Sequence, residues 1–469
     1  MASMQIVSST LTRNLILANT GRIATERTKI SDASEIRGIF IHSSNTLYPD
    51  WNLIAQTAVQ YGINTIVVEA MGNSWGRYPS DVISHWDYDL LTPGLQASRS
   101  NGLKFYVAMN VLAEGKPDNL SLTTIRASTM AYGDAMCPTN PGSRDRLRAI
   151  VEELVRRWDI DGFMFDYMRY TWGDECACPY CKAKFIADTG LSNVNWPTDI
   201  KDGGRYQAQF MNWHTVPVNE LVRDMKDWML AINPNLEFAA ATWRWPPEAP
   251  NYWRYWIGQD STYWVKEGWL DWVAPMFYTD DVNELTVGAQ SYVDLQTGGP
   301  EGKIPVAPFI DTVVDTVSTP ENFKQRVAAI RQLGGDGYVI WRYGGPGDGQ
   351  GSSSPDIRPY LDGINQNQTF LLRSIAVSTF SDRATISWVT DKPATTKVEY
   401  STSPIFDATF RSSYWEVDHI VGTVVENATL EIAHNLTLTG LLSGQTYYFR
   451  VQSKDGSGIA TSKVLTFRL

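Results

Sequence analysis

The segment DIDGFMFDYMRY, residues 159–170, ends a short apolar run in a group of polar and aromatic side chains. The run from Gly162 to Phe165 is apolar throughout, which is typical of a parallel strand that is buried on both faces. Asp166 follows directly, and Tyr167 and Arg169 come next. An aspartate in this position is expected to be partly desolvated, which favours its neutral form unless a cation compensates. A strand of this kind predicts an α/β fold.

Similar apolar runs recur along the chain, with helical patterns between several of them. The strand candidates are residues 37–44, 64–70, 104–110, 162–167, 236–242, 272–278, 305–310 and 337–343. Eight strands that alternate with helices predict a (β/α)₈ TIM barrel. A doubly wound open sheet would instead carry a glycine fingerprint after its first strand, and residues 39–50 contain none.

Two helical segments have recognisable boundaries. In residues 143–159, Ser143 is the expected N-cap, and an apolar stripe follows it at helical spacing. Residues 209–232 predict a longer helix that is interrupted or begun at Pro217, because proline lacks the N–H that a helix interior needs.

The sequence changes character after residue 344, where a Gly/Ser/Pro-rich stretch begins. From about residue 370, alternating strand patterns separated by turns predict an all-β sandwich. The expected domains are an N-terminal extension (1–35), the barrel (36–366) and the sandwich (367–469). The stretches SWVTDKPATTKVEYSTS and LTGLLSGQTYYFRVQSKDGSG resemble a fibronectin type III domain, which implies a structural corner role for Tyr447.

Polar and aromatic side chains stand where the predicted barrel strands end. They are His42, Glu69, Asn110, Asp166, Trp243, Tyr278, Asp311 and Trp341, with Arg169, Tyr170, Asp280 and Asp281 just beyond strand ends. The active site of a TIM barrel forms at this C-terminal rim. Carboxylates can perform acid–base chemistry on a sugar, and planar aromatic faces can pack on its C–H groups. The 18 Trp and 22 Tyr of the chain fit such a site, although a Trp-rich core is the alternative.

Glycosidases use a pair of carboxyl groups. We expect Asp166 to be the nucleophile or base, with Arg169 keeping it ionised; the alternative is a purely structural ion pair between them. Asp280 is the expected general acid, and Asp281 is the second choice. Glu69 and Asp311 are further candidates. The residues expected to contact the sugar are His42, Glu69, Asn110, Arg169, Tyr170, Trp243, Tyr278, Asp281, Asp311 and Trp341.

Four stretches between residues 35 and 343 carry a family resemblance. EIRGIFIHSS, NPGSRDRLRAIVEELVRRWDIDGFMFDYMRY, WLDWVAPMFY and GGDGYVIWRY are similar to the glycosyl-hydrolase-like family 10 barrels. The resemblance implies hydrolysis of glycosidic bonds, in some members within bacterial cell-wall glycan strands. It also implies that Asp166 is the catalytic carboxylate and that Asp161 and Gly162 begin its strand. The family usually has proline after the RY pair; here Thr171 and Trp172 follow, which leaves the substrate open.

The four cysteines form a separate group. Cys137 falls in the loop after the third predicted strand, and Cys176, Cys178 and Cys181 follow the fourth as CACPYC. These loops are neighbours on the rim, so the thiols are predicted to form a structural Cys₄ zinc site, for which tetrahedral Zn²⁺ is suited. Two disulfides, in an exported protein, or free thiols are the alternatives, although a C-x-C disulfide is geometrically awkward.

Composition limits the other functions. The net charge of −11 argues against a nucleic-acid partner, and no apolar run is long enough to span a membrane. No signal peptide is recognisable, yet the fibronectin-like module and polysaccharide chemistry suggest export. A non-catalytic carbohydrate-binding barrel and a zinc-dependent hydrolase of amide or ester bonds are the rival functions. The five histidines form no cluster, which disfavours a catalytic metal.

Overall fold

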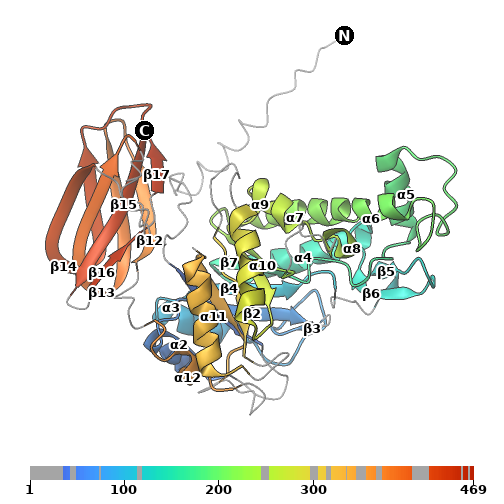
Figure 1. The fold of residues 1–469 in the computed structure, drawn as a ribbon, viewed down its shortest axis with the longest axis horizontal. Helices are drawn as coiled ribbons and strands as arrows, with labels where there is room; N and C mark the ends of the chain where they lie inside the picture. The colour runs from blue at the N-terminus through green and yellow to red at the C-terminus, as the bar shows by residue number, and fades with distance from the viewer. Residues whose placement is uncertain are drawn as a thin grey trace, which may run out of the picture. The chain divides into compact units, whose positions relative to one another are not determined.

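The computed structural model of the chain describes two compact units, Glu35–Asn367 and Gln368–Leu469 (Figure 1). The described residues are 35–42, 49–72, 75–113, 119–244, 253–295, 305–312, 318–333, 335–344, 355–365, 372–403, 422–455, 458–462 and 465–469. The predicted N-terminal extension lies outside them, apart from Glu35.

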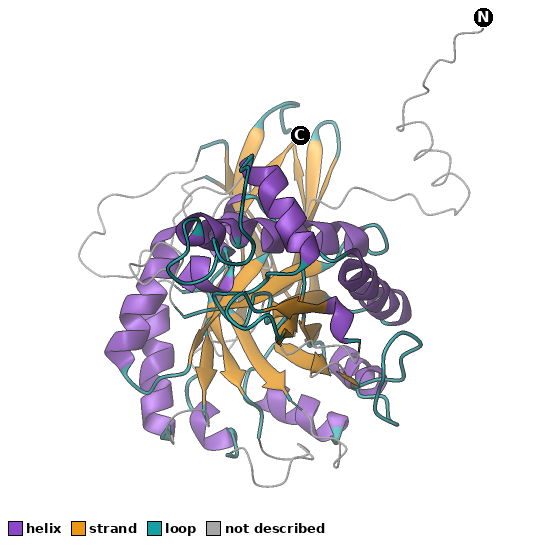
Figure 2. Cartoon of the chain, turned by 90° about the vertical axis from the view of Figure 1, so that its right-hand side faces the viewer, coloured by secondary structure: helices purple, strands orange, loops and turns teal. Residues whose placement is uncertain are grey.

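The first unit is a closed barrel of parallel strands. They are β1 (Ile36–Ile41), β2 (Thr65–Gly72), β4 (Lys104–Asn110), β7 (Gly162–Asp166), β8 (Glu237–Thr242), β9 (Trp272–Phe277), β10 (Phe309–Asp311) and β11 (Gly337–Trp341). Each strand pairs in parallel with the next, and β1 pairs with both β2 and β11, which closes the sheet. Helices enclose these strands (Figure 2). The TIM-barrel prediction is confirmed.

The helices of the first unit lie between its strands in the sequence, except α12, which follows the last strand. They are α2 (Trp51–Gln60), α3 (Leu91–Ser100), α4 (Pro141–Arg157), α5 (Pro179–Thr189), α6 (Gln207–Trp213), α7 (Thr215–Leu230), α8 (Trp253–Ile257), α9 (Ser261–Lys266), α10 (Val282–Leu295), α11 (Pro320–Gln332) and α12 (Arg358–Leu361). The shorter elements are β3 (Trp75–Gly76), the 3₁₀ helix η1 (Leu120–Leu122), β5 (Thr123–Ile125) and β6 (Tyr132–Met136). Within the described residues, no helix combines the length and apolarity needed to cross a bilayer.

Two predicted helix boundaries were wrong. The N-cap of α4 is Asn140, whose side chain accepts a hydrogen bond from the Gly142 N–H, because Pro141 already starts the helix. The Ser143 hydroxyl lies inside the helix and donates to the Leu122 carbonyl over 2.7 Å. The break between α6 and α7 lies at His214 rather than at Pro217, which occupies the first turn of α7, where proline is tolerated.

The barrel interior is packed with side chains from every strand. One buried cluster contains Phe40, Val67, Tyr106, Ala108, Met164, Ala239, Ala241, Trp272, Ala274, Ala307, Phe309 and Val339, with Met276 packed against it. A second, larger cluster joins the outer faces of the strands to the helices. Because side chains alternate along a strand, the residue two positions beyond an interior residue also points inward. This alternation determines which side chains reach the mouth of the barrel.

The second unit consists of antiparallel strands. They are β12 (Leu372–Thr379), β13 (Arg383–Ser401), β14 (Thr423–Thr439), β15 (Thr446–Asp455), β16 (Gly458–Thr461) and β17 (Leu465–Arg468). All of their pairings are antiparallel, and they enclose a separate core that includes Trp388 and Phe449. The Tyr447 hydroxyl accepts a hydrogen bond from the Leu442 N–H over 2.8 Å, as expected for a corner tyrosine.

Candidate active site

One layer of side chains closes the mouth of the barrel above its apolar interior. Each of its members stands two residues beyond an interior residue of the same strand: His42, Glu69, Asn110, Asp166, Trp243, Tyr278, Asp311 and Trp341. All eight were predicted from the sequence as residues at strand ends. Their common inward direction follows from the alternation of the strands.

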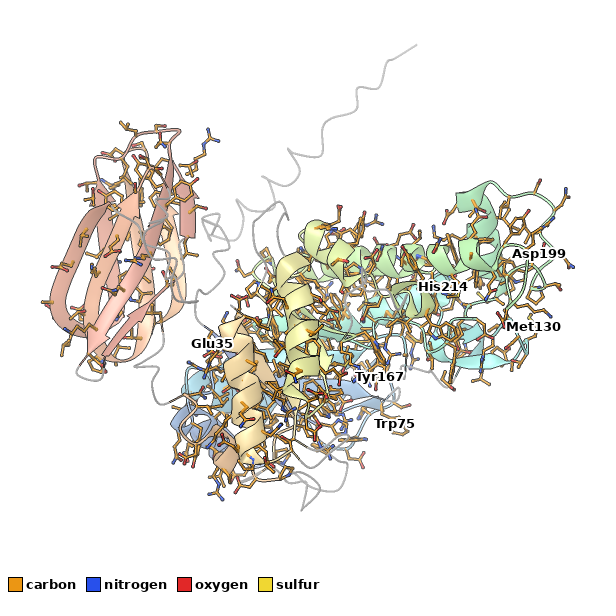
Figure 3. The ribbon with its side chains drawn as sticks, viewed as in Figure 1. Glu35, Trp75, Met130, Tyr167, Asp199 and His214 are labelled. Atoms are coloured by element: carbon orange, nitrogen blue, oxygen red, sulfur yellow. The ribbon has the colours of Figure 1, made fainter. Side chains whose placement is uncertain are left out.

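Asp166 is the last residue of β7 and is 7% exposed. Its Oδ1 atom accepts a hydrogen bond from the Tyr167 N–H over 2.7 Å, which favours the ionised carboxylate. Tyr167 has φ 47°, so the chain turns sharply after the strand. Figure 3 labels this residue. Asn110 is the residue that pairs with Asp166 across β4 and β7. The carboxylate is therefore held at the mouth beside an amide side chain.

Tyr278 and Trp341 form an aromatic wall beside this carboxylate. Burial raises the pKa of Tyr278 well above its ordinary value, and the negative charge of Asp166 raises it further. The phenol therefore stays protonated and can donate a hydrogen bond near Asp166. The ring centre of Trp341 lies 6.0 Å from that of Tyr278 and 5.8 Å from that of His42. These rings offer planar faces at the barrel mouth.

Arg169 bridges aromatic side chains on the rim. Its guanidinium carbon lies 4.8 Å from the ring centre of Tyr167 and 5.4 Å from that of Trp243, within the range of cation–π attraction. Its Nη1 atom also donates to the Tyr170 carbonyl over 3.2 Å. Arg169 thus links the loop after β7 to the end of β8.

Glu69 contacts two basic side chains. Its Oε2 atom lies 2.5 Å from Arg77 Nη2 and is also in contact with His42 Nδ1. Arg77 is buried, which lowers its pKa, and its guanidinium lies 4.6 Å from the ring centre of Trp86. Arg77 could not be predicted from a strand end, because it follows the short strand β3 rather than a barrel strand. The group positions His42 at the mouth.

The predicted aspartates after β9 and β10 have different surroundings. Asp311 and Arg326 form a buried ion pair, with Nη1 3.0 Å from Oδ1. The Asp281 carboxylate accepts from the N–H groups of Asn283 and Glu284 and so caps the start of α10. Only Asp280 of these three presents an exposed side chain whose carboxylate is neither a helix cap nor part of a buried pair in the described structure.

Tyr170 does not face the mouth of the barrel. Its side chain is fully buried, its ring centre lies 5.0 Å from that of His214, and its hydroxyl has no hydrogen-bond partner among the described residues. Burial raises the pKa of Tyr170 well above its ordinary value, and the nearby cysteines raise it further. The predicted sugar contact is wrong for this residue, because the Tyr170 side chain points away from the mouth and toward the cysteines.

Glu284 is a further residue that was not predicted; it lies on α10, outside any strand end. Its Oε1 atom is 3.1 Å from Arg244 Nη1, and its Oε2 accepts from the Thr279 hydroxyl over 2.8 Å. Arg244 follows Trp243 after β8, so this ion pair joins the ends of β8 and β9. No local pattern marked it, because its partner is distant in sequence.

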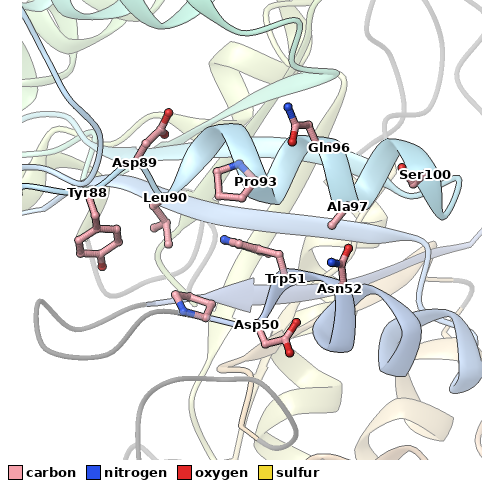
Figure 4. A pocket seen from close by; sticks show the side chains of 11 residues that line it. Asp50, Trp51, Asn52, Tyr88, Asp89, Leu90, Pro93, Gln96, Ala97 and Ser100 are labelled. Atoms are coloured by element: carbon pink, nitrogen blue, oxygen red, sulfur yellow. The ribbon is translucent and has the colours of Figure 1, made fainter.

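A groove of about 500 Å³ lies outside the barrel, between α2 and α3 (Figure 4). Asp50, Trp51, Tyr88, Asp89 and Gln96 are among its lining residues. None of the mouth residues lines it. We therefore place the candidate active site at the mouth, where the carboxylate and the aromatic wall meet.

The four cysteines converge beside the loop after β7. Cys137 directly follows β6, Cys176 and Cys178 precede α5, and Cys181 lies in its first turn. All four are buried, and their sulfur atoms lie within 4.8 Å of one another. Cys137 Sγ is 3.5 Å from the Sγ atoms of both Cys178 and Cys181. The predicted convergence is confirmed, whereas the zinc ion stays a prediction.

The sequence pattern of the family described as glycosyl hydrolase-like 10 matches residues 100–325, a range that contains Asp166 and all four cysteines. This confirms the resemblance predicted for the barrel. The pattern described as the purple acid phosphatase N-terminal domain matches residues 374–469. That match does not confirm the fibronectin type III resemblance, although the antiparallel all-β architecture of the second unit is as expected.

Individual proteins give weaker similarities. The glycosyl hydrolase DigH of Escherichia coli is 24% identical over 256 residues, which are 46% of this chain and 55% of DigH. An S-layer-related protein of Niallia circulans is 28% identical over 150 residues, 26% of this chain and 9% of that protein. The chain thus spans about half or less of these relatives.

Among solved structures, the PgaB (BpsB) glycoside hydrolase domain of Bordetella bronchiseptica aligns with a TM-score of 0.54 at 13% identity. The alignment covers 66% of this chain and 94% of that domain, so the two share the barrel fold. The matching family, DigH and this domain are all named for glycoside hydrolysis. The barrel is therefore similar to proteins that are named for glycoside hydrolysis.

Proposed function

We propose that the barrel hydrolyses glycosidic bonds in a poly- or oligosaccharide, with Asp166 as the reacting carboxylate. The observation that carries this proposal is the position of Asp166, inward-facing at the end of β7 and beside a protonated Tyr278. An ionised carboxylate and a neutral hydrogen-bond donor at one point are what attack at a sugar ring carbon requires. The family match over residues 100–325 supports the same chemistry.

Asp166 acts either as the nucleophile, which forms a bond to the anomeric carbon, or as the base that takes a proton from the attacking water. In both cases it must be ionised before the reaction, and the Tyr167 N–H that it accepts favours that state. The Tyr278 phenol donates to a sugar oxygen near the anomeric carbon. Trp341 and Trp243 bind the faces of neighbouring sugar rings.

Asp280 is the proposed general acid, which gives its proton to the leaving oxygen. Its side chain is exposed after β9, so it can approach a bound glycan. The carboxylates of Glu69 and Asp311 are each held in an ion pair with an arginine, so they are poorly placed to approach the leaving oxygen of a glycan. Asp281 is occupied as the cap of α10.

The alternative is a barrel that binds carbohydrate without cleaving it. The observation that favours it is that two carboxylates of the mouth, Glu69 and Asp311, are engaged by arginines. A binding barrel needs the aromatic wall but no proton donor. The zinc-dependent amide or ester hydrolase loses support, because among the described residues the cysteine cluster includes no histidine or carboxylate.

The test is hydrolysis of a panel of polysaccharides, bacterial cell-wall glycan strands and aryl glycosides, with the product anomers followed by NMR. Wild type, Asp166→Asn and Asp280→Asn are compared, and Asp281→Asn is the matched control beside Asp280. We expect Asp166→Asn to lose about 10³-fold or more in kcat and Asp280→Asn about 10²-fold on unactivated glycans. Asp281→Asn should keep its rate.

Equal rates for wild type and Asp166→Asn would contradict the assignment of Asp166. Glycan binding by a folded wild type that cleaves nothing on the panel would favour the binding barrel. Asp280→Asn with unchanged rate on every glycan would remove Asp280 as the acid. The anomer of the first product distinguishes retention from inversion.

We further propose that the protein acts outside the cytoplasm, where polysaccharides of cell walls and matrices are exposed to hydrolysis. The match to an S-layer-related protein supports this location. Fractionation of the native host and detection of the protein by antibody would test it, and a purely cytoplasmic signal would contradict it.

A further inference from the structure

We propose that Cys137, Cys176, Cys178 and Cys181 bind one Zn²⁺ in a closed tetrahedral site that fixes the loop between β7 and α5. The metal part of this proposal is independent of the proposed function. Its effect on the sugar site, through Arg169 on the same loop, rests on that function.

The sulfur positions fit a tetrahedral ion better than disulfides. Zinc–sulfur bonds of about 2.3 Å place the sulfurs of a regular tetrahedron about 3.8 Å apart. Cys137 Sγ lies 3.5 Å from two other sulfurs, and all four sulfurs lie within 4.8 Å of one another. A disulfide requires about 2.05 Å and joins sulfurs in separate pairs. Four sulfurs grouped around one point are instead the donor set of a structural zinc site.

Hydrogen-bond donors surround the sulfurs. The Ile125 N–H donates to Cys176 Sγ over 3.3 Å, and the Cys181 N–H donates to Cys178 Sγ over 3.4 Å. The Thr139 hydroxyl lies 2.9 Å from Cys181 Sγ and 3.1 Å from Cys137 Sγ. Four thiolates around Zn²⁺ leave a net negative charge, which such donors stabilise. Cys178 is also the N-cap of α5, where the helix dipole favours an anion.

The cluster joins two segments of the rim, one after β4 and one after β7. The segment with β5 and β6 comes after β4, and the loop with Cys176 and Cys178 comes after β7. Backbone bonds already connect them: Ala127 N–H to the Asp174 carbonyl over 2.8 Å, and Ala177 N–H to the Ile125 carbonyl over 2.6 Å. An ion with one ligand from the first segment and three from the second locks them together.

Tyr170 stands between the cluster and Arg169: its side chain is near the cysteines, and Arg169 precedes it in the same loop. This side chain lies against the cysteines, and its backbone N–H donates to the Ile257 carbonyl over 2.8 Å. Arg169, the preceding residue, holds its guanidinium over Tyr167 and Trp243. Loss of the ion would loosen this loop and displace Arg169. With four thiolate ligands the ion has no open position for water, so its role is structural.

The first measurement is the metal content of the full chain, purified without chelators, by inductively coupled plasma mass spectrometry. We expect one zinc per chain. Titration with a mercurial should release that zinc as it modifies four thiols, which are all the cysteines of the chain. Intact mass after alkylation under denaturing conditions should show four reduced cysteines.

Variants give the second measurement. Cys176→Ser and Cys181→Ser should each lose at least 90% of the bound zinc, whereas Tyr180→Ala should keep it. Tyr180 is the matched control because it is 48% exposed and lies between Cys178 and Cys181. If the cysteine variants do not fold, replacement of zinc by Co²⁺ in wild type gives the answer, since a four-thiolate site has intense charge-transfer and tetrahedral d–d absorption.

Metal-free wild type with four free thiols would overturn the proposal, as would wild type with two disulfides. A cobalt spectrum without thiolate charge transfer would also contradict it. The effect on the rim is read separately: a folded, zinc-depleted protein should show a KM raised about tenfold with kcat changed less. If zinc is bound but no glycan is cleaved, the metal site stands and only the proposed function fails.

Discussion

At the scale of single residues, the neutral phenol of Tyr278 is the most specific feature beside Asp166. Burial and the Asp166 charge raise its pKa well above the ordinary value, so the phenol is a hydrogen-bond donor at neutral pH. We expect Tyr278→Phe to lower kcat/KM about 10²-fold, the usual loss for one preorganised donor, with Tm nearly unchanged. Initial rates at several pH values and a thermal melt measure both.

Ionisation of the Tyr278 phenol should not lower the wild-type rate at alkaline pH. The wild type and Tyr278→Phe should therefore have pH–rate profiles of the same shape on the alkaline side. A limb near pH 10 that disappears in the variant would mean that the phenol ionises in the working range, contrary to its burial. Trp341→Phe is the comparison variant, because it changes the size of a ring in the same aromatic wall and leaves the Tyr278 phenol in place.

His214 gives a prediction about stability rather than activity. Burial lowers its pKa from 6.5 to about 4, and its Nδ1 bonds the Tyr255 carbonyl over 3.0 Å. Between pH 6.5 and about 4, the His214 imidazole therefore binds a proton more readily in the unfolded chain than in the folded one. The stability that comes from burying the neutral His214 side chain is fully present above pH 6.5 and is lost as the pH falls through about 4. It amounts to on the order of 3 kcal/mol of unfolding free energy.

His214→Asn keeps a donor near the Nδ1 position and cannot titrate. The free energy of unfolding, measured with denaturant between pH 7 and 4, should therefore fall less steeply in the variant than in wild type. His85→Asn is the control, because His85 is half-buried and its Nδ1 also contacts a backbone carbonyl, that of Trp86. Parallel pH curves for wild type and His214→Asn would contradict the prediction.

At the scale of elements, the buried pair of Asp311 and Arg326 fastens α11 to the end of β10. Arg326 also donates to the Thr279 carbonyl and to the Ser318 hydroxyl. Arg326→Met leaves a buried carboxylate without its cation and should cost about 3–5 kcal/mol of unfolding free energy. Asp311→Leu combined with Arg326→Met should recover part of that loss. Denaturant unfolding of the three proteins measures it, and a double variant no more stable than the single would contradict it.

The elements also explain which site residues could be predicted from the sequence. Apolar runs identify buried parallel strands, and the alternation along them places Asp166, Tyr278 and Trp341 in the mouth without any tertiary information. The ion pair of Asp311 and the inward turn of Tyr170 could not be predicted in this way. Both depend on partners outside the strand itself: Arg326 on α11 and the cysteine cluster.

Helix caps were harder to predict than helices. Ser143 and Asn140 are both good N-cap residues, and the position of Pro141 decides between them. Asp281 comes shortly after β9, whereas Asp166 is the last residue of β7, and Asp281 caps α10 because that helix begins one residue later. A carboxylate after a strand is therefore ambiguous until the start of the next helix is known.

At the scale of the whole molecule, the two units have separate cores. The barrel core and the barrel interior contain residues only from the first unit, and the core around Trp388 and Phe449 contains residues only from the second. Since each unit buries its own apolar surface, we expect two unfolding transitions in calorimetry. The cysteine cluster lies wholly in the barrel, so the proposed zinc ion should stabilise one transition alone.

Removal of the proposed zinc ion by a mercurial, followed by a chelator, should lower the Tm of the barrel transition by about 5 °C or more. The transition of the second unit should not move, because none of the four cysteines lies in it. Residues 368–469 alone, melted under the same conditions, identify which transition is which. An equal shift of both transitions would mean that the units unfold together and would contradict the separation of their cores.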